Sequence, residues 1–572
     1  MLRAFVEHLR RPVLDLDGFW QFKFLGEVEP DAVKVRSIVY DDVMSVPMSF
    51  DATPKYAGLR GLVAYRKTVT LDRAGGAKLI FGSVHHWCRV FVNGKAVRDH
   101  VGGFTRFEIT LDRLPAGENE IVVLVDNRFN FERCPLHLDY ADWYHHGGIT
   151  RGVELHLLPA AFIDRAQVDV VDLHARKLRL RITAASAKGG DVPLTVTVGS
   201  KTVISKKIAM KPGSQLLSFE FALKGAAFWS AESPNLHTMQ ISFGDDDLIE
   251  RFGIRQVEVK GQNVQVNGQA LRLLGFNRHE AHPEFGHSVP KGLMLADLQI
   301  LKKMNCNFIR GSHYPQDQMF LDLCDELGFY VWVENTGWQY NENHLSNPAF
   351  MRAALENTSE MVAASYNRPS VIMWGIFNES DSDKEKAKPG YAAAMKRIKE
   401  LDATRPTTYA TYKWENDICL DLCDIVSLNI YPGWYWSELA EVPGHINKIL
   451  AHVETRGAKN KPVIISEVGG DAMPGHSDWF GDRWSEDYQS KLLRSVIETL
   501  FVTGRRTCGL AIWQYCDMRS TEAIPRILGK PHGFNRKGVV DEYRKPKEAF
   551  YVVRDLFAKL KKIIIRARRC RA

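Results

Sequence analysis

The sequence lacks several features that would assign a protein to a class at once. No stretch approaches about 18 uncharged apolar residues, so no membrane-spanning helix is expected. The nine cysteines are odd in number, scattered and without a Cys-x-x-Cys pair, which argues against a disulfide framework. There is no Walker-type loop, no Gly-x-Gly-x-x-Gly after a strand, no internal repeat and no low-complexity segment. Nucleotide binding, a repeat architecture and disorder are therefore not expected.

Charge is also nearly balanced. The chain has 75 Lys and Arg against 68 Asp and Glu, a net charge of +7 in 572 residues, which predicts no nucleic-acid partner. The first twelve residues are charged throughout and lack the apolar core of a signal peptide, so we expect a cytoplasmic protein. The basic residues 561–572 are expected to form a solvated tail that binds no membrane.

The pattern of the first half indicates two β-sandwiches. Hydrophobic residues make up 45% and charged residues 25% of a chain long enough for about three or four domains. Residues 1–160 consist of short alternating runs, such as 88–94 and 121–125, separated by Gly, Pro, Asn and Asp turns. Residues 161–260 repeat this pattern more weakly and predict a second sandwich of immunoglobulin size.

From residue 261 to about 560, strand-like runs alternate with helical stretches. The runs are 271–276, 308–310, 330–334, 371–377, 407–409, 425–430, 463–466 and 509–513. Eight such strands in about 300 residues predict a parallel (β/α)₈ barrel, or TIM barrel. Between the first two strands, Met294, Leu298, Leu301 and Met304 recur at helical spacing after Pro290, so we expect a helix there with this stripe in the core.

Two glutamates follow apolar strands of this barrel at its carboxyl end, where such folds place reactive groups. Glu379, preceded by Asn378, follows the fourth strand, and Glu467 closes the seventh. These strands face each other, so the two carboxylates can lie about 5 to 5.5 Å apart, as in a retaining glycosidase. Either glutamate alone would equally fit a salt bridge at the barrel rim. The pair, with Asn378, favours glycoside hydrolysis.

Several segments look like the signature segments of glycoside hydrolase family 2. They are Gly275-Phe-Asn-Arg-His279-Glu280, Cys306-Asn-Phe-Ile-Arg310-Gly-Ser-His313-Tyr-Pro315 and Trp374-Gly-Ile-Phe-Asn378-Glu379, and the likeness extends from residues 16–20 to 544–547. The resemblance implies an N-terminal jelly-roll sugar-binding domain, an immunoglobulin-like β-sandwich and a catalytic barrel. It also implies Glu379 as acid/base, Glu467 as nucleophile, a glycoside substrate, no cofactor and a homo-oligomer.

Finer features resemble the β-glucuronidase branch of the family. Residues 464–489 are similar to its nucleophile region, and Tyr431 and Tyr435 belong to a loop like its tyrosine-bearing loop. Asn535-Arg-Lys537-Gly538 looks like the Asn-x-Lys element that binds the sugar carboxylate, where an ammonium and an amide form charge-assisted hydrogen bonds. Lys537 would alternatively only brace its loop. The rival functions are a β-galactosidase or β-galacturonidase on the same scaffold and a non-catalytic carbohydrate-binding protein.

The same resemblance implies further sugar-binding residues around the barrel mouth. They are Asp142, His279, His313, Asn378, Tyr431, Tyr435, Trp513 and Arg526, with Asn535 and Lys537. Residues 530–534 appear as an insertion before Asn535. The pairs Cys419/Cys423 and His145/His146 offer metal-ligand atom types without the four-ligand spacing of a zinc site, so no metal is expected.

Overall fold

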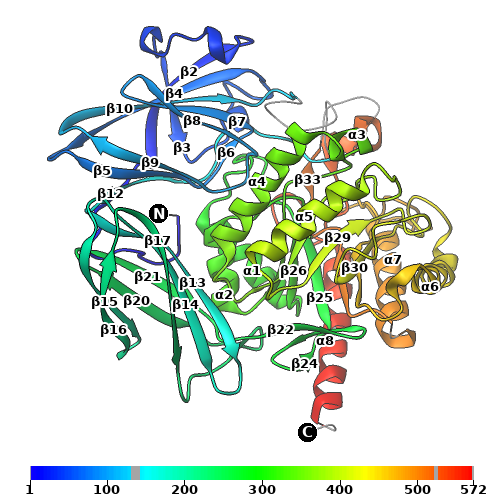
Figure 1. Cartoon of the computed structure of the whole chain (residues 1–572). Helices are drawn as coiled ribbons and strands as arrows, with labels where there is room; N and C mark the ends of the chain where they lie inside the picture. The colour runs from blue at the N-terminus through cyan, green and yellow to red at the C-terminus, as the bar shows by residue number, and fades with distance from the viewer. Residues whose placement is uncertain (1, 131–141, 505, 521–525, 570–572) are drawn as a thin grey trace.

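The computed structural model describes residues 2–130, 142–504, 506–520 and 526–569, without the side chains of 526 and 564–569. Figure 1 shows three units: two β-sandwiches, one above the other, lie along one side of a (β/α)₈ barrel. The predicted fold, a jelly-roll sandwich, an immunoglobulin-like sandwich and a TIM barrel in this order, is confirmed. No helix in the described ranges combines the length and the apolarity needed to cross a bilayer.

The N-terminal sandwich packs a four-stranded sheet on a six-stranded sheet. The first has the order β1 (Val13–Asp15), β12 (Val153–Leu158), β5 (Gly75–Phe81), β9 (Phe107–Leu114), and the second β3 (Asp42–Val46), β2 (Gly18–Gly26), β4 (Leu62–Leu71), β10 (Gly117–Asp126), β7 (Trp87–Val92), β8 (Lys95–Val101). A short pair, β6 (Val84–His85) with β11 (Gly148–Ile149), lies at one end. Alternating inward residues of both sheets form one apolar core, as the period-2 pattern requires.

The second sandwich is smaller. One sheet has the order β13 (Ala161–Asp172), β14 (Lys177–Ser186), β17 (Gly213–Ala222), and the other β16 (Lys201–Met210), β15 (Gly190–Val198), β20 (His237–Phe243), β21 (Asp246–Phe252). Three short strands then lead toward the barrel: β22 (Val257–Lys260), β23 (Asn263–Val266) and β24 (Gln269–Ala270). Val264 and Val266 join an apolar cluster with barrel residues such as Tyr330 and Ile464.

Eight parallel strands close the barrel. They are β25 (Leu273–Arg278), β26 (Phe308–Gly311), β27 (Tyr330–Glu334), β28 (Val371–Ile376), β29 (Thr407–Thr411), β30 (Ile425–Asn429), β31 (Val463–Glu467) and β32 (Gly509–Ile512). All eight predicted strands are present. Gly275 permits the close approach of the first two, because a Cβ there would lie 1.7 Å from the carbonyl oxygen of Phe308.

Helices cover the outside of the barrel. They are α1 (Lys291–Lys303), α2 (Gln318–Leu327), α3 (Glu342–Leu345), α4 (Pro348–Ser365), α5 (Lys388–Leu401), α6 (Val442–Val453), α7 (Glu486–Glu498) and α8 (Glu548–Arg569). Pro290 is the N-cap of α1, and the predicted stripe from Met294 to Met304 is buried. The expected basic tail begins inside α8, which continues through residue 569 (Figure 1).

The N-terminal sandwich is attached to the barrel near its carboxyl end. The ring of Phe104 stacks on Tyr314 with 3.7 Å between centroids. Arg151 donates to the Glu280 carboxylate at 2.7 Å and to the carbonyl of Pro315 at 2.8 Å, and all three groups are buried. A buried pair of this kind must be well bonded to offset its desolvation, so it fixes the relative position of the two domains. This contact brings the segment after residue 142 to the barrel mouth.

Candidate active site

The two predicted catalytic glutamates lie at the same end of the barrel. Glu467 is the last residue of β31, and Glu379 follows β28 after a turn in which Phe377 and Glu379 have left-handed backbone angles, φ 42° and 52°. Such angles are costly for non-glycine residues and are found where surrounding structure imposes them. The Glu379 amide donates to the carbonyl of Ala410 at 2.8 Å, which holds this turn.

Glu467 is held by one cation and one phenol. Arg310 Nη1 donates to Glu467 Oε1 at 2.8 Å, and the Tyr431 hydroxyl donates to Oε2 at 2.7 Å. Burial, and then the charge of Glu379, raise the pKa of Glu467, while Arg310 and Tyr431 lower it. The charge of Glu379 therefore acts on Glu467.

Glu379 has a different environment. Among the described residues its carboxylate receives hydrogen bonds only from neutral amides, Asn429 Nδ2 at 2.9 Å and Gln339 Nε2 at 3.1 Å. Burial is the main cause that raises its pKa. Because the cation contacts Glu467 and only amides contact Glu379, the geometry favours negative charge on Glu467 and the shared proton on Glu379.

Arg310 links four strands of the barrel. Besides Glu467, its guanidinium donates to both oxygens of Glu334 at 3.0 to 3.2 Å, to Asn277 Oδ1 at 3.0 Å and to Asn378 Oδ1 at 2.7 Å. Arg310 and Glu334 are fully buried, and burial raises the pKa of Glu334 to about 7 although Arg310 opposes this shift. One cation therefore orients Glu467 and Asn378 together.

Asn378 is positioned to meet a ligand. Its Oδ1 accepts from Arg310 and from Asn429 Nδ2 at 3.1 Å, so its amide orientation is set. Within the described ranges its buried Nδ2 has no acceptor. A buried donor without a partner is uncommon, and at this position it is available for a hydroxyl of a bound molecule.

Aromatic rings surround these polar groups. Trp513 stacks on His313 at 5.1 Å and 14°, and His279 meets the edge of Trp513 at 5.4 Å. His313 Nδ1 bonds Glu334 Oε1 at 2.9 Å, which leaves Nε2 facing Glu467 Oε1 at 3.8 Å. Burial lowers the pKa of both histidines, so they are neutral at pH 7. These rings give this side of the site an apolar surface, and the polar atoms of the two histidines carry no charge.

A second group of predicted residues lies at the rim. Lys537 is buried, forms an ion pair with Asp471 and lies 4.9 Å from the centroid of the Tyr435 ring. Asn535 Nδ2 donates to Asp142 Oδ2 at 3.1 Å. The segment of the N-terminal sandwich that contains Asp142 therefore reaches the Asn-x-Lys element. Asn535 and Lys537, which were predicted to bind the carboxylate of the sugar, thus contact carboxylates of the protein itself.

The structure adds residues that the sequence interpretation did not assign. Lys530, in the apparent insertion, is buried and pairs with Asp142 Oδ1 at 3.3 Å. Arg310, Glu334, Gln339, Asn429 and Asp471 also belong to the site by the contacts above. Arg310, Glu334 and Asn429 are polar residues within or at the end of buried strands, which is a signal the sequence did carry. The side chain of Arg526 lies outside the described residues.

Comparison with known proteins gives a consistent result along the chain. Three sequence models match in succession: "Glycosyl hydrolases family 2, sugar binding domain" at residues 15–159, "Glycosyl hydrolases family 2" at 161–255, and "Glycosyl hydrolases family 2, TIM barrel domain" at 257–562. The chain is 27% identical to a β-glucuronidase of Paenibacillus borealis over 606 residues, covering 96% of this chain and 98% of the relative.

Two solved structures are similar over almost their whole length. The β-galacturonidase from Eisenbergiella tayi bound to galacturonate has a TM-score of 0.90 and 32% identity, covering 98% of this chain and 99% of that one. The β-glucuronidase from Ruminococcus gnavus in complex with C6-substituted uronic isofagomine has a TM-score of 0.85 and 26% identity, covering 97% and 99%.

Replacing the central cation tests its structural role. Arg310→Met should lower the free energy of unfolding at pH 7 by about 3 to 5 kcal/mol, because it leaves two buried carboxyls without their cation. The pKa values of both carboxyls are already raised by burial, and without Arg310 they should rise further above the unfolded ones, so the loss should shrink as pH falls toward 5. Denaturant unfolding at both pH values measures this.

The matched control for this experiment is Arg179→Met, which removes an exposed ion pair to Glu220 on the second sandwich. It should change stability far less and with little pH dependence. A destabilisation by Arg310→Met that is equally large at both pH values would contradict the account based on buried charge.

Proposed function

We propose that the chain, which belongs to glycoside hydrolase family 2, is a retaining exo-glycosidase that removes terminal β-D-glucuronate from glycosides. The observation that carries this proposal is the unequal pair at the barrel mouth. Glu467 is bonded to Arg310, whereas Glu379 is bonded only to amides among the described residues. Two carboxyls with different environments can take the two roles that glycoside hydrolysis needs.

The proposed reaction has two steps. Ionised Glu467 attacks the anomeric carbon while Glu379 gives its proton to the leaving aglycone oxygen, so that the glycosidic bond breaks as the glycosyl ester forms. Glu379, now a carboxylate, takes a proton from water, which attacks the same carbon and releases Glu467. Two displacements retain the anomeric configuration. Asn378 Nδ2 is the donor available to a sugar hydroxyl beside the reacting carbon.

Two buried lysines support a uronate as the sugar. An ammonium group has three donors, and among the described residues Lys537 and Lys530 each form an ion pair with one aspartate, Asp471 and Asp142. Each lysine therefore retains donors for the C6 carboxylate of a sugar. A neutral hexose offers them only hydroxyl oxygens and no opposite charge, so it would satisfy the buried ammonium groups less well than a uronate does. The uronic ligand held by the R. gnavus relative is consistent with this preference.

A β-galacturonide is the second candidate substrate. The E. tayi protein, whose structure was solved with galacturonate, has a higher identity and TM-score than the R. gnavus glucuronidase. Glucuronate and galacturonate carry the same carboxylate and differ in the orientation of one ring hydroxyl, so the lysines serve both. A β-galactoside lacks the carboxylate. A non-catalytic carbohydrate-binding protein needs no buried carboxyl pair of this kind.

We also propose a cytoplasmic location and a homo-oligomeric assembly. Support for the location is that the seven cysteines among the described residues are free thiols, as is usual in a reducing compartment. Support for the assembly is the resemblance to an often oligomeric family. Cell fractionation tests the first, and light scattering on the purified full chain tests the second.

Removing the nucleophile should stop catalysis on every substrate. Glu467→Gln keeps the size of the side chain but cannot form the glycosyl ester, so turnover should fall by at least about 1,000-fold. The measurement uses a panel of chromogenic β-glucuronide, β-galacturonide, β-galactoside and β-mannoside, with Glu415→Gln on an exposed loop as control. Wild-type activity on none of the four glycosides, or full activity of Glu467→Gln, would refute the proposal.

Removing one lysine should change substrate preference. Lys537→Met should lower kcat/KM for the uronides by at least about 100-fold more than for the β-galactoside, because only the uronides lose an ion pair between the sugar carboxylate and the ammonium. The ratio of the two rates in one preparation cancels any loss of folded protein. Exposed Lys545→Met is the control and should leave the ratio unchanged. Equal losses on both substrate types would mean that Lys537 only braces its loop.

The pH dependence of activity should reflect the ionisation of Glu379 and Glu467. Activity should be bell-shaped, since Glu467 must be ionised and Glu379 protonated. Tyr431 donates to Glu467 and lowers its pKa, so Tyr431→Phe should raise that pKa and move the acidic limb of kcat/KM to higher pH. Tyr435→Phe removes a hydroxyl without a bond to Glu467 and is the control. A limb that moves to lower pH in Tyr431→Phe would contradict the assignment.

A further inference from the structure

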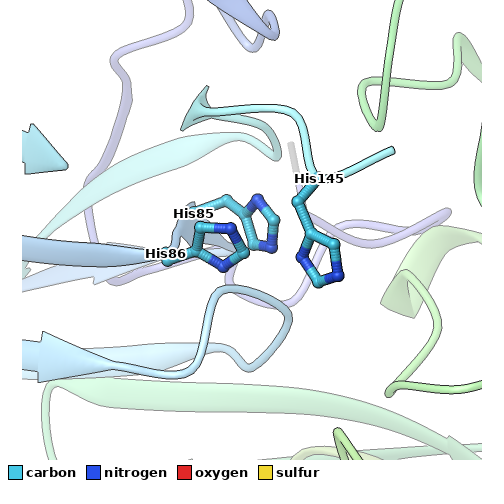
Figure 2. A group of neighbouring side chains, drawn as sticks. All are labelled: His85, His86 and His145. Atoms are coloured by element: carbon cyan, nitrogen blue, oxygen red, sulfur yellow. The ribbon is translucent and has the colours of Figure 1, made fainter. Parts of the chain in front are cut away.

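Three buried histidine side chains gather where the N-terminal sandwich meets the barrel. His85 is the last residue of β6 and His86 follows it, whereas His145 comes from the segment that leads into β11, the partner of β6. Figure 2 shows their rings lying together. They are 0%, 4% and 1% exposed, and one nitrogen of each lies within 4.8 Å of the others.

These imidazoles have nitrogen atoms without protein partners. Within the part of the chain that the structure describes, His85 Nε2, His86 Nε2 and both nitrogens of His145 form no hydrogen bond. Leaving so many buried polar atoms unsatisfied is costly, and buried nitrogens normally have a partner. These nitrogens lie close together, which indicates that a single bound group supplies the missing partner.

The tautomer of His85 suits a ligand. Its Nδ1 is hydrogen-bonded to the backbone carbonyl of His146, so Nδ1 carries the proton and the lone pair of Nε2 points elsewhere. Metal-bound histidines typically donate their second nitrogen to a carbonyl in this way. Burial lowers the pKa of all three histidines, which keeps the imidazoles neutral and able to coordinate at pH 7.

The neighbouring cation does not occupy the cluster. Arg60 is close enough to lower the pKa of His86 and His145, but its Nη1 donates to the carbonyls of Asn127 and His145 at 2.9 and 3.1 Å. Its guanidinium also lies over the ring of Phe129 at 4.3 Å. These contacts direct it toward backbone oxygen and an aromatic face.

A space for a fourth ligand adjoins two of the histidines. A cavity of about 20 Å³ is lined by His86, His145, Gly102, Thr336, Tyr340 and Asn357, among others. That volume is enough for one water molecule. The buried hydroxyl of Thr336 on its wall has no partner among the described residues and is available to bond such a water.

We propose that His85, His86 and His145 form a binding site for a divalent transition metal, with Zn²⁺ as the ion that fits best. Three imidazole nitrogens and one water are a tetrahedral zinc donor set, whereas Mg²⁺ and Ca²⁺ require oxygen ligands that this cluster lacks. Zinc–nitrogen bonds of about 2.0 to 2.1 Å place the nitrogens about 3.4 Å apart.

The ion would hold in place the segment of residues 142–145, which reaches the barrel mouth. His145 lies two residues after Trp143, whose ring is 4.6 Å from that of His145 and 5.6 Å from that of His313. Asp142 precedes Trp143 and contacts Lys530 and Asn535. A metal that joins His145 to β6 therefore holds this segment against the sandwich. Metal binding itself does not depend on the proposed glycuronidase activity.

Direct titration tests the proposal. The full chain, prepared without a histidine tag and stripped with a chelator, is titrated with Zn²⁺ by calorimetry, and its thermal midpoint is recorded with and without the ion. We expect one zinc per chain and a midpoint that rises with zinc concentration, since the ion binds only the folded site. Absence of stoichiometric binding to the wild-type chain would overturn the proposal, whatever the variants do.

Two variants locate the ion. His145→Asn keeps a polar side chain and should weaken zinc binding by at least about 100-fold, more than loss of an outer hydrogen bond to a ligand costs. His174→Asn, at an exposed histidine of the second sandwich, should bind zinc as the wild type does. Unchanged affinity in a folded His145→Asn protein would show that the ion binds elsewhere. Zinc affinity is measured without substrate, so an inactive glycosidase would not alter this result.

Discussion

The active site depends on one buried guanidinium. Arg310 is fully enclosed and bonds Asn277, Glu334 and Glu467 on three barrel strands and Asn378 in the turn after β28. A buried cation is tolerated only when its donors are satisfied, so the strands must meet in the register that provides these acceptors. The same contacts orient Glu467 and hold the amide of Asn378. The geometry of the site therefore depends on the barrel closing in the correct register, and a distortion of either one disturbs the other.

Two chemically identical side chains at the barrel mouth have different environments. Glu467 is buried and Glu379 is half-buried, and burial raises the pKa of each. Arg310 and Tyr431 contact Glu467, whereas amides contact Glu379. This geometry favours the negative charge on Glu467. The remaining charges at the rim are paired, Lys537 with Asp471 and Lys530 with Asp142. The rim therefore presents lysines that are held in place yet retain donors.

The N-terminal sandwich takes part in the site through a short segment. Phe104 and Arg151 attach the sandwich to the barrel, and the residues after 142 then reach the mouth. Trp143 contacts the histidine cluster on one side and His279 and His313 on the other. Glycoside hydrolase family 2 membership accounts for the domain order. The imidazoles of His85, His86 and His145 lie where this segment leaves the sandwich, so an ion there and the sugar site would share a structural support.

The sequence by itself determined the two sandwiches, the eight barrel strands and the positions of Glu379 and Glu467, because alternation and strand ends are local properties of neighbouring residues. The helix from Lys291 to Lys303 followed from spacing in the same way. Only the tertiary structure decided that Lys537 pairs with Asp471, that Lys530 of the apparent insertion reaches Asp142, and that His85, His86 and His145 converge. These contacts join residues far apart in the chain through irregular loops. Their distances depend on how the domains pack, which no periodicity encodes.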